Sequence, residues 1–258
     1  MTDEQGLAAA HGNRDYPWDE FSPDDYFKYN YANMRDDDRQ IVETVRDFFV
    51  KTFQDVPPSG LRGIDVGTGS NLYPALTMLP FCESITLCEF SAANVEWLER
   101  QSIEEWPSWD EAWANFWLVL SKKPQYERFP DPKTELARRV RIVQGDVLSL
   151  EADRRWDVGT MFFVAESITG QHEEFIEALD HFFGLLKPNS PFAMAFMEHS
   201  KGYKVGQQPF PATDIDRLEV KDCLNERATG VETFHLGPGD KPLREAYTGM
   251  IVAHGRVK

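Results

Sequence analysis

Hydrophobic residues follow two alternating patterns along most of the chain. Short apolar runs predict strands, whereas apolar positions three and four residues apart predict helices at residues 70–79, 91–101 and 172–186. The predicted strands lie at residues 63–66, 84–89, 140–144, 158–164 and 192–197. Strands that alternate with helices form a mainly parallel sheet covered on both faces, so the pattern predicts an α/β fold.

The pattern changes near the end of the chain. A helix is predicted at residues 214–227, followed by two strands at residues 231–236 and 247–257. The segment between these strands is too short for a crossover helix, so they should form an antiparallel hairpin. We therefore expect a seven-stranded sheet that is mostly parallel and ends in an antiparallel hairpin.

An N-terminal helical cap is expected at residues 1–56. Ser22 can cap a helix that starts at Pro23, and Asp25 completes the capping box. A second helix, with acidic residues in its first turn, should span residues 36–53.

Residues 102–139 interrupt the alternation and should form a helical insertion. Within it, a tryptophan-rich helix is predicted at residues 107–121 behind a Ser108 cap, and its tryptophans are spaced as in a packing face rather than a ligand site. The economical organisation is a single domain over residues 1–258.

Charge limits the partners. The formal net charge is −16 and the pI about 4.8, so the surface should repel phosphate backbones, and we expect no nucleic-acid partner. The sequence has no basic amphipathic helix and no long apolar stretch, so we expect no membrane partner. A small molecule, neutral or cationic, is the expected partner. The oligomeric state stays open, with a monomer as the simplest expectation.

The number and spacing of cysteines and histidines disfavour disulfide bonds and metal sites. The 3 cysteines show no CxxC spacing, and the 6 histidines no HExxH spacing, so we expect no metal site. The first residues are acidic and contain no apolar run, so we expect no signal peptide and a cytoplasmic location.

Three strand ends carry side chains suited to a nucleoside. The first leads into Gly67-Thr68-Gly69, where glycine allows a sharp turn and close approach of a ligand, although a purely structural turn would use glycine too. The second ends in Glu89, whose carboxylate can accept both ribose hydroxyls. The third ends in Asp146 and Val147, an acceptor for an adenine amino group beside an apolar wall.

The first turn also distinguishes between cofactors. A dinucleotide-binding turn has a third glycine where this chain has Leu72, and Asp65 would repel phosphates but suits a cationic sulfonium. We therefore expect S-adenosylmethionine as cofactor, with S-adenosylhomocysteine as its product. An NAD-dependent oxidoreductase is the less favoured alternative, since a parallel sheet followed by an antiparallel hairpin is typical of methyltransferases.

At these and further positions the chain resembles the nicotinamide, phenylethanolamine and thioether-indolethylamine methyltransferases. The shared motifs are FSPDDY (21–26) with Tyr31, DVGTGSNLY (65–73), EFSAAN (89–94), GDV (145–147), FFVAES (162–167), ALDHFFGLLKP (178–188) and YKVG (203–206). The resemblance covers nearly the whole chain from Phe21. It implies a Rossmann-like class I methyltransferase fold and methyl transfer to a small molecule, an amine or a ring nitrogen.

The resemblance also implies roles for the matching residues. Tyr26 and Tyr31 would close over the two ligands, the alternative being ordinary helix packing. Glu166 would orient an acceptor amine and help it lose its proton, and Tyr26 is the other expected catalytic residue. The methionine end of the cofactor would lie against Gly67, Thr68, Gly69 and Tyr73, and the adenosine against Glu89, Phe90, Asn94, Asp146 and Val147. Phe162 and Phe163 would line the junction of the two ligands, and Phe163, Ser200 and Tyr203 would also face the acceptor.

Two departures limit what the resemblance implies. Glu89 stands where the family usually has aspartate, and the loop at residues 198–202 differs, so the identity of the acceptor does not carry over. Glu166 could instead be a capping or surface residue. A non-catalytic S-adenosylmethionine-binding regulator is the alternative function.

Overall fold

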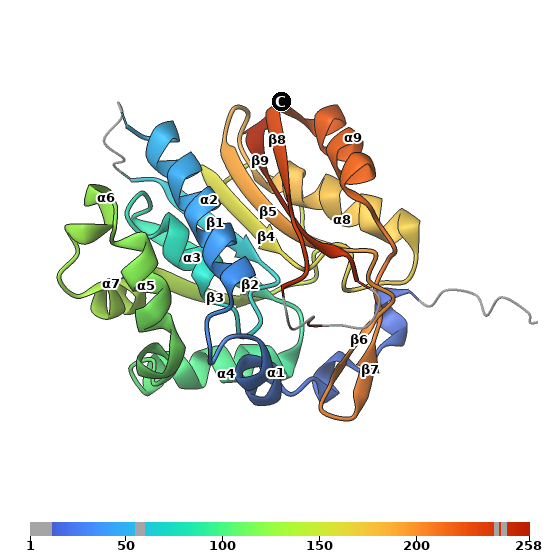
Figure 1. Ribbon diagram of the computed structural model, residues 1–258, viewed down its shortest axis with the longest axis horizontal. Helices are drawn as coiled ribbons and strands as arrows, with labels where there is room; N and C mark the ends of the chain where they lie inside the picture. Colours follow the sequence, from blue (N-terminus) through green and yellow to red (C-terminus); the bar gives the residue numbers. More distant parts are fainter. Residues whose placement is uncertain (1–11, 55–59, 240–242, 244–246) are drawn as a thin grey trace, which may run out of the picture.

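The sheet has the predicted architecture. A computed structural model describes residues 12–54, 60–239, 243 and 247–258, and its main sheet has seven strands in the order β3-β2-β1-β4-β5-β9-β8 (Figure 1). The strands are β1 (Arg62–Val66), β2 (Ser84–Glu89), β3 (Val140–Gln144), β4 (Val158–Phe162), β5 (Pro191–Glu198), β8 (Ala228–Leu236) and β9 (Gly249–Val257). The first five pair in parallel, and β9 is antiparallel to both β5 and β8.

Two hydrophobic layers cover the sheet because successive side chains of a strand point to opposite faces. On one face, Ile64 and Met161 belong to a core with α8 (His172–Leu185) and α9 (Arg217–Arg227). On the other, Ile85 and Leu87 pack in a core that includes α2 (Asp36–Thr52), α3 (Tyr73–Met78) and α4 (Ala92–Ile103). Figure 1 shows these helices on the two sides of the sheet. The central strands β4 and β5 are buried along their whole length.

The N-terminal helices lie at one end of the sheet. Two short 3-10 helices, η1 (Asn13–Asp15) and η2 (Trp18–Glu20), precede α1 (Pro23–Asn30). The Ser22 hydroxyl accepts a hydrogen bond from the Asp25 N–H at 3.3 Å, which confirms Ser22 as the N-cap residue of α1. Residues 1–11 and 55–56 of the expected cap lie outside the described residues.

The tryptophan-rich insertion differs from the prediction. A π-helix (η3, Trp109–Trp113) precedes α5 (Ala114–Leu120), followed by α6 (Pro124–Glu127) and α7 (Pro132–Arg139). Ser108 makes no side-chain cap; its hydroxyl instead accepts a hydrogen bond from the Trp113 indole at 3.0 Å. The prediction that Ser108 caps this helix was therefore wrong, because its hydroxyl is bound to the buried indole N–H. Trp113 and Phe116 are fully buried and Trp109 and Trp117 nearly so, as expected of a packing face.

Two features near the site were not predicted. The fourth strand ends at Phe162 because Phe163 adopts a left-handed backbone with φ of 59°. A small hairpin of β6 (Tyr203–Val205) and β7 (Gln208–Phe210) follows the loop after β5.

Candidate active site

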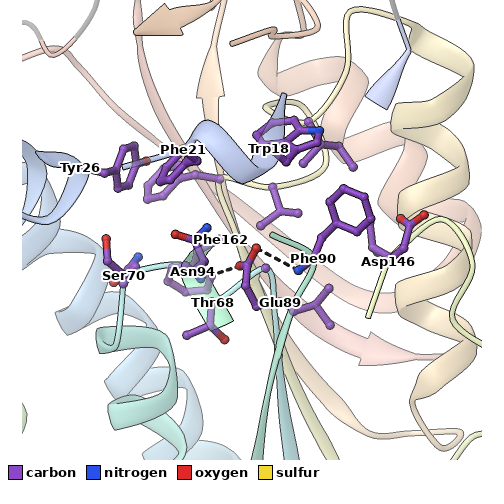
Figure 2. A pocket seen from close by; sticks show the side chains of 18 of the residues that line it. Trp18, Phe21, Tyr26, Thr68, Ser70, Glu89, Phe90, Asn94, Asp146 and Phe162 are labelled. Carbon is purple, nitrogen blue, oxygen red and sulfur yellow. Dashed lines mark hydrogen bonds between the residues drawn. The ribbon is translucent and has the colours of Figure 1, made fainter. Parts of the chain in front are cut away.

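The carboxyl ends of β1 to β4 surround a cavity that has a nucleoside-binding end and an aromatic end. Figure 2 shows Trp18, Phe21 and Tyr26 on one side of it and Thr68, Ser70 and Glu89 on the other. Most residues expected at the cofactor line this cavity: Tyr26, Tyr31, Gly67, Thr68, Gly69, Glu89, Phe90, Asn94, Asp146, Val147, Phe162 and Phe163, together with Tyr203 from the acceptor side. Open α/β sheets bind ligands at this edge, where the strand order reverses between β1 and β4.

The turn after β1 requires glycine for two reasons. Gly67 has φ of 69° and Gly69 has φ of 51°, a region that disfavours other residues. A Cβ on Gly67 would also lie 2.4 Å from Val164 Cγ2. The Gly67 N–H donates to the Cys88 carbonyl at 2.7 Å, so the turn is fixed to β2.

Asp65 supports this turn from below. Its carboxylate accepts hydrogen bonds from the hydroxyls of Thr68 at 2.9 Å and Thr160 at 2.7 Å. Burial raises the pKa of Asp65 to about 7, although both hydroxyls oppose the rise. Asp65 does not line the cavity, so its expected attraction for a sulfonium would act through the turn rather than by contact.

Glu89 has the hydrogen-bonding environment expected of a ribose-binding carboxylate. One oxygen accepts from the Gly69 N–H at 2.8 Å, and the other from the N–H groups of Phe90 and Ser91, both at 2.9 Å. Burial raises the pKa of Glu89, opposed by these hydrogen bonds and by Asn94. The carboxylate is thereby fixed in one orientation across the cavity from the N-terminal aromatic residues (Figure 2).

Several buried polar atoms around the cavity are ready for a ligand. Within the described part of the chain, four of them have no hydrogen-bond partner: Asn13 Oδ1, Ser70 Oγ, Asn71 Nδ2 and Asn94 Oδ1. Buried polar groups are normally satisfied, and leaving one unpaired costs about 1–3 kcal/mol. A polar ligand such as the ribose and amino acid portions of S-adenosylmethionine would pair them, so the residues present fit this cofactor.

An aromatic cover closes the cavity on the side opposite the sheet. The Trp18 ring stacks on Phe210 with centroids 4.9 Å apart, and Tyr203 stacks on the same ring at 5.6 Å. Phe21 contacts Phe210 and Tyr26. The cover therefore joins the N-terminal segment to the β6–β7 hairpin.

Polar contacts tie this segment to α4. The Trp18 carbonyl accepts from the Ser91 hydroxyl at 2.7 Å, and the Asp24 carboxylate accepts from the Trp97 indole at 2.9 Å. Three lining residues of this segment, Asn13, Trp18 and Phe21, were not predicted as site residues from the sequence. The signal available in the sequence was the group of aromatic residues just before and at the start of the FSPDDY motif.

Three expected residues are not brought to this cavity. Tyr73 is fully buried and stacks on Phe116 with centroids 5.2 Å apart. Glu166 is fully buried, and one of its oxygens accepts from the Met197 N–H at 3.1 Å and the Ser167 hydroxyl at 3.0 Å. Ser200 is fully buried as well. None of the three is among the residues that line the cavity.

A second, smaller cavity adjoins the first and has a volume of about 20 Å³, enough for a water-sized group. Tyr26, Tyr31 and Phe163 line both cavities. The remaining lining residues are Asn30, Asp38, Met197, Leu243 and Met250. Phe163 reaches this shared position from a strained backbone, and strain of this kind concentrates at functional sites.

The fold and the site together define a class I S-adenosylmethionine-dependent methyltransferase. A family model described as the NNMT/PNMT/TEMT family matches residues 10–250, and the chain belongs to this family. The chain is 26% identical to phenylethanolamine N-methyltransferase of Bos taurus, a match that covers 88% of this chain and 82% of the relative. It is 21% identical to nicotinamide N-methyltransferase of Sus scrofa, covering 84% of each.

Solved structures have the same fold. Magnesium protoporphyrin IX methyltransferase from Synechocystis, with bound S-adenosylmethionine, gives a TM-score of 0.56 at 14% identity over 96% of this chain and 99% of that one. An N-methyltransferase from Bradyrhizobium japonicum, in complex with S-adenosylhomocysteine, gives 0.53 at 10% identity over 87% and 89%. Among the described residues, no group of three potential ligands could hold a metal ion, and no helix is long and apolar enough to cross a membrane.

Proposed function

We propose that this methyltransferase transfers the methyl group of S-adenosylmethionine to the nitrogen of a small amine. The observation that carries the proposal is the wall of Tyr26, Tyr31 and Phe163, which the cofactor cavity shares with the second, smaller cavity. This second cavity, called the chamber below, is also lined by the buried carboxylate of Asp38. An aromatic junction attracts a cation, and a buried carboxylate favours one strongly. The relatives named for amine acceptors support the same choice.

The cofactor supplies a methyl group on a positively charged sulfur, and the chain's own residues do the positioning. Glu89 would accept the ribose hydroxyls, Asp146 and Val147 would bind the adenine, and the turn at Gly67 would lie against the methionine end. Tyr26 and Phe163 would line the path between the sulfonium and the acceptor nitrogen. In-line transfer requires the two reacting atoms about 3 Å apart in a site without water, and the aromatic cover supports both conditions.

Turnover with a panel of acceptors tests the proposal. We expect methylated product and S-adenosylhomocysteine in equal amounts from primary or secondary amines, measured by mass spectrometry. Tight binding of S-adenosylhomocysteine with no product from any amine, ring nitrogen, alcohol or thiol would instead support the non-catalytic regulator. Product from oxygen or sulfur acceptors alone would contradict an amine acceptor.

We further propose a cytoplasmic monomer that forms one domain. Cys82, Cys88 and Cys223 are free thiols, which fits a reducing compartment. The cofactor and acceptor cavities are lined by one chain, so a second copy is not needed to complete them. Light scattering coupled to size-exclusion chromatography should give a mass near 29.6 kDa, and a mass near twice that value would contradict the monomer.

A further inference from the structure

The second cavity is lined by a carboxylate that forms no ion pair with any described residue. Asp38 lies in the first turn of α2 and is 3% exposed, and its Oδ2 has no hydrogen-bond partner within the described ranges of the chain. The same residue lines the chamber beyond Tyr26 and Tyr31. An unpaired carboxylate oxygen that is buried in this way is costly unless a ligand pairs it.

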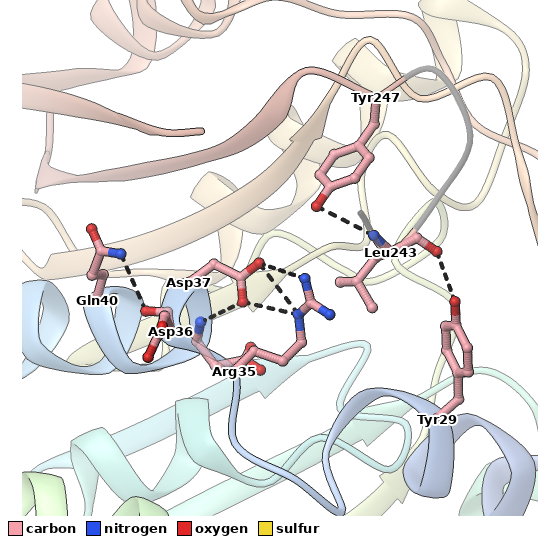
Figure 3. Close-up of polar contacts among 8 residues, drawn as sticks. Tyr29, Arg35, Asp36, Asp37, Gln40, Leu243 and Tyr247 are labelled. Carbon is pink, nitrogen blue, oxygen red and sulfur yellow. Dashed lines mark hydrogen bonds and ion pairs between the residues drawn. The ribbon is translucent and has the colours of Figure 1, made fainter. Parts of the chain in front are cut away.

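The neighbouring residue Asp37 already has hydrogen-bond partners for its carboxylate, which distinguishes it from Asp38. Asp37 accepts hydrogen bonds from the Arg35 guanidinium at 3.0 and 3.1 Å and from the Asp38 N–H at 2.9 Å. Figure 3 shows the Arg35 side chain directed at Asp37. Arg35 therefore contacts Asp37 directly and acts on Asp38, which lines the chamber, only from a distance.

Leu243 lines the chamber and is tied by two hydrogen bonds to tyrosine hydroxyls. The Leu243 carbonyl accepts from the Tyr29 hydroxyl at 3.1 Å, and its N–H donates to the Tyr247 hydroxyl at 3.4 Å (Figure 3). The chamber thus has an apolar end at Leu243 and Met250, an aromatic junction toward the cofactor cavity, and one carboxylate. This arrangement suits the cationic group of a small amine, since the space is about that of an ammonium group.

We infer that Asp38 is a catalytic residue that binds the ammonium group of a primary or secondary amine acceptor and takes its proton. This inference rests on the proposed N-methylation and assigns the acceptor's charge to one side chain. In the balanced step, the ammonium N–H proton moves to Asp38 Oδ2 and leaves a lone pair on nitrogen. That lone pair forms the N–CH₃ bond as the S–CH₃ bond breaks, and the sulfur leaves as a neutral thioether.

The environment of Asp38 adapts it to this proton transfer. Burial and the charge of Asp37 raise the pKa of Asp38 to about 8, opposed by Arg35 and by the hydroxyl of Tyr73. Tyr31 also faces this carboxylate, and its own pKa is raised, mainly by burial. A carboxyl group with a pKa near 8 is a far better proton acceptor for an alkylammonium, whose pKa is about 10, than an ordinary carboxylate is.

Binding of benzylamine to the protein saturated with S-adenosylhomocysteine tests the inference without turnover. By calorimetry at pH 8, we expect Asp38→Asn to weaken benzylamine binding at least tenfold and to leave the uncharged analogue benzyl alcohol within twofold. Asp36→Asn is the matched control, because Asp36 lies on the same turn with its side chain 96% exposed, and it should leave both affinities unchanged. Equal benzylamine affinity in Asp38→Asn and wild type, or no benzylamine binding by wild type, would overturn the inference.

The pH dependence provides a second readout. Because Asp38 must be ionised to pair with the ammonium, benzylamine affinity of wild type should rise by nearly tenfold per pH unit from pH 6 and level off near pH 8. Asp38→Asn should lack this rise. A wild-type profile that is flat from pH 6 to 8 would contradict the assignment.

The melting temperature of the variant shows whether the substitution disturbs the fold. Because the pKa of Asp38 is raised in the folded protein, its protonated carboxyl group contributes to the free energy of unfolding in full below about pH 4. This contribution is lost as the pH rises to about 8. Asp38→Asn removes this loss, so its melting temperature should equal or exceed that of wild type at pH 8. A clearly lower melting temperature would show that the charge of Asp38 stabilises the fold, which contradicts the inference.

Turnover separates the two proposals. If benzylamine binds through Asp38 but no amine receives a methyl group, the proposed N-methylation fails and the ammonium site stands. If amines are methylated equally by wild type and Asp38→Asn, the inference about Asp38 fails and N-methylation stands.

Discussion

Glu89 accepts three backbone hydrogen bonds and still faces the cavity. Replacing it by glutamine keeps its length but removes the charge and one acceptor. We expect Glu89→Gln to weaken S-adenosylmethionine by roughly 1.5–3 kcal/mol, because hydrogen bonds from hydroxyls to a charged group are lost. The same loss should appear for S-adenosylhomocysteine, since both carry the ribose.

Calorimetric titration of both cofactor forms would measure this change. Glu96→Gln, an exposed acid on α4, is the control and should bind both like wild type. Unchanged affinity in Glu89→Gln would remove the ribose assignment.

Glu166 has contacts that favour a positioning role. Its side chain accepts from the Met197 N–H and its carbonyl accepts from the Thr213 N–H at 2.7 Å, so it connects the end of β4 to β5 and to the segment before α9. We expect Glu166→Gln to lower kcat/KM by less than tenfold, and equally for a cationic and a neutral acceptor. A selective loss for the cationic acceptor would instead support the direct contact with the amine that the family resemblance implies.

The residues that the sequence predicted best are those at strand ends. Glu89 and Asp146 could be found because each terminates an apolar run, and backbone geometry then directs them to the same edge of the sheet. Asp38 could not be found this way. It follows Asp36 and Asp37 in a helix first turn, where three acids look alike as partners of the helix dipole. Their burial differs sharply, with Asp36 96% exposed and Asp38 3%, and burial depends on tertiary packing.

At the scale of elements, the aromatic cover over the cofactor cavity is supported by Phe210 of β7. Phe210 does not line the cofactor cavity, but it stacks on Trp18 and Tyr203, which do. We expect Phe210→Ala to raise KM for cofactor and acceptor severalfold, because both lining rings lose their support. Phe210→Leu, which keeps most of the apolar contact, should restore much of the loss. Steady-state kinetics with both variants measure this, and an unchanged KM for both substrates would show that the ring stack is dispensable.

Element prediction succeeded where the periodicity was long and failed where it was short. The strands and α8 follow sustained patterns, and each is found within a few residues of its predicted bounds. β6 and β7 have three residues each, too few to show an alternation. The end of β4 was placed two residues too late, because Phe162 and Phe163 are both apolar and only the backbone angle at Phe163 stops the strand.

At the scale of the whole molecule, the net charge of −16 acts on any charged acceptor. A negative surface raises the encounter rate with cations, and salt screens this attraction over about 10 Å at 0.1 M. We therefore expect kcat/KM for a cationic amine to fall severalfold between 10 and 300 mM salt. The value for a neutral ring nitrogen should stay nearly constant. Equal salt dependence for the two acceptors would show that the surface charge does not steer them.

The aromatic cover also governs the sequence of events in one catalytic cycle. Trp18, Phe21 and Tyr26 line the cofactor cavity on its aromatic side, so we expect a spent cofactor to leave by moving this part of the chain aside. Tyr26 and Tyr31 also border the acceptor chamber, so we expect the same movement to release the methylated product. Substrate entry and product exit would then share one opening step. When that step is slower than methyl transfer, the first turnover is faster than those that follow, and the cover sets the steady-state rate.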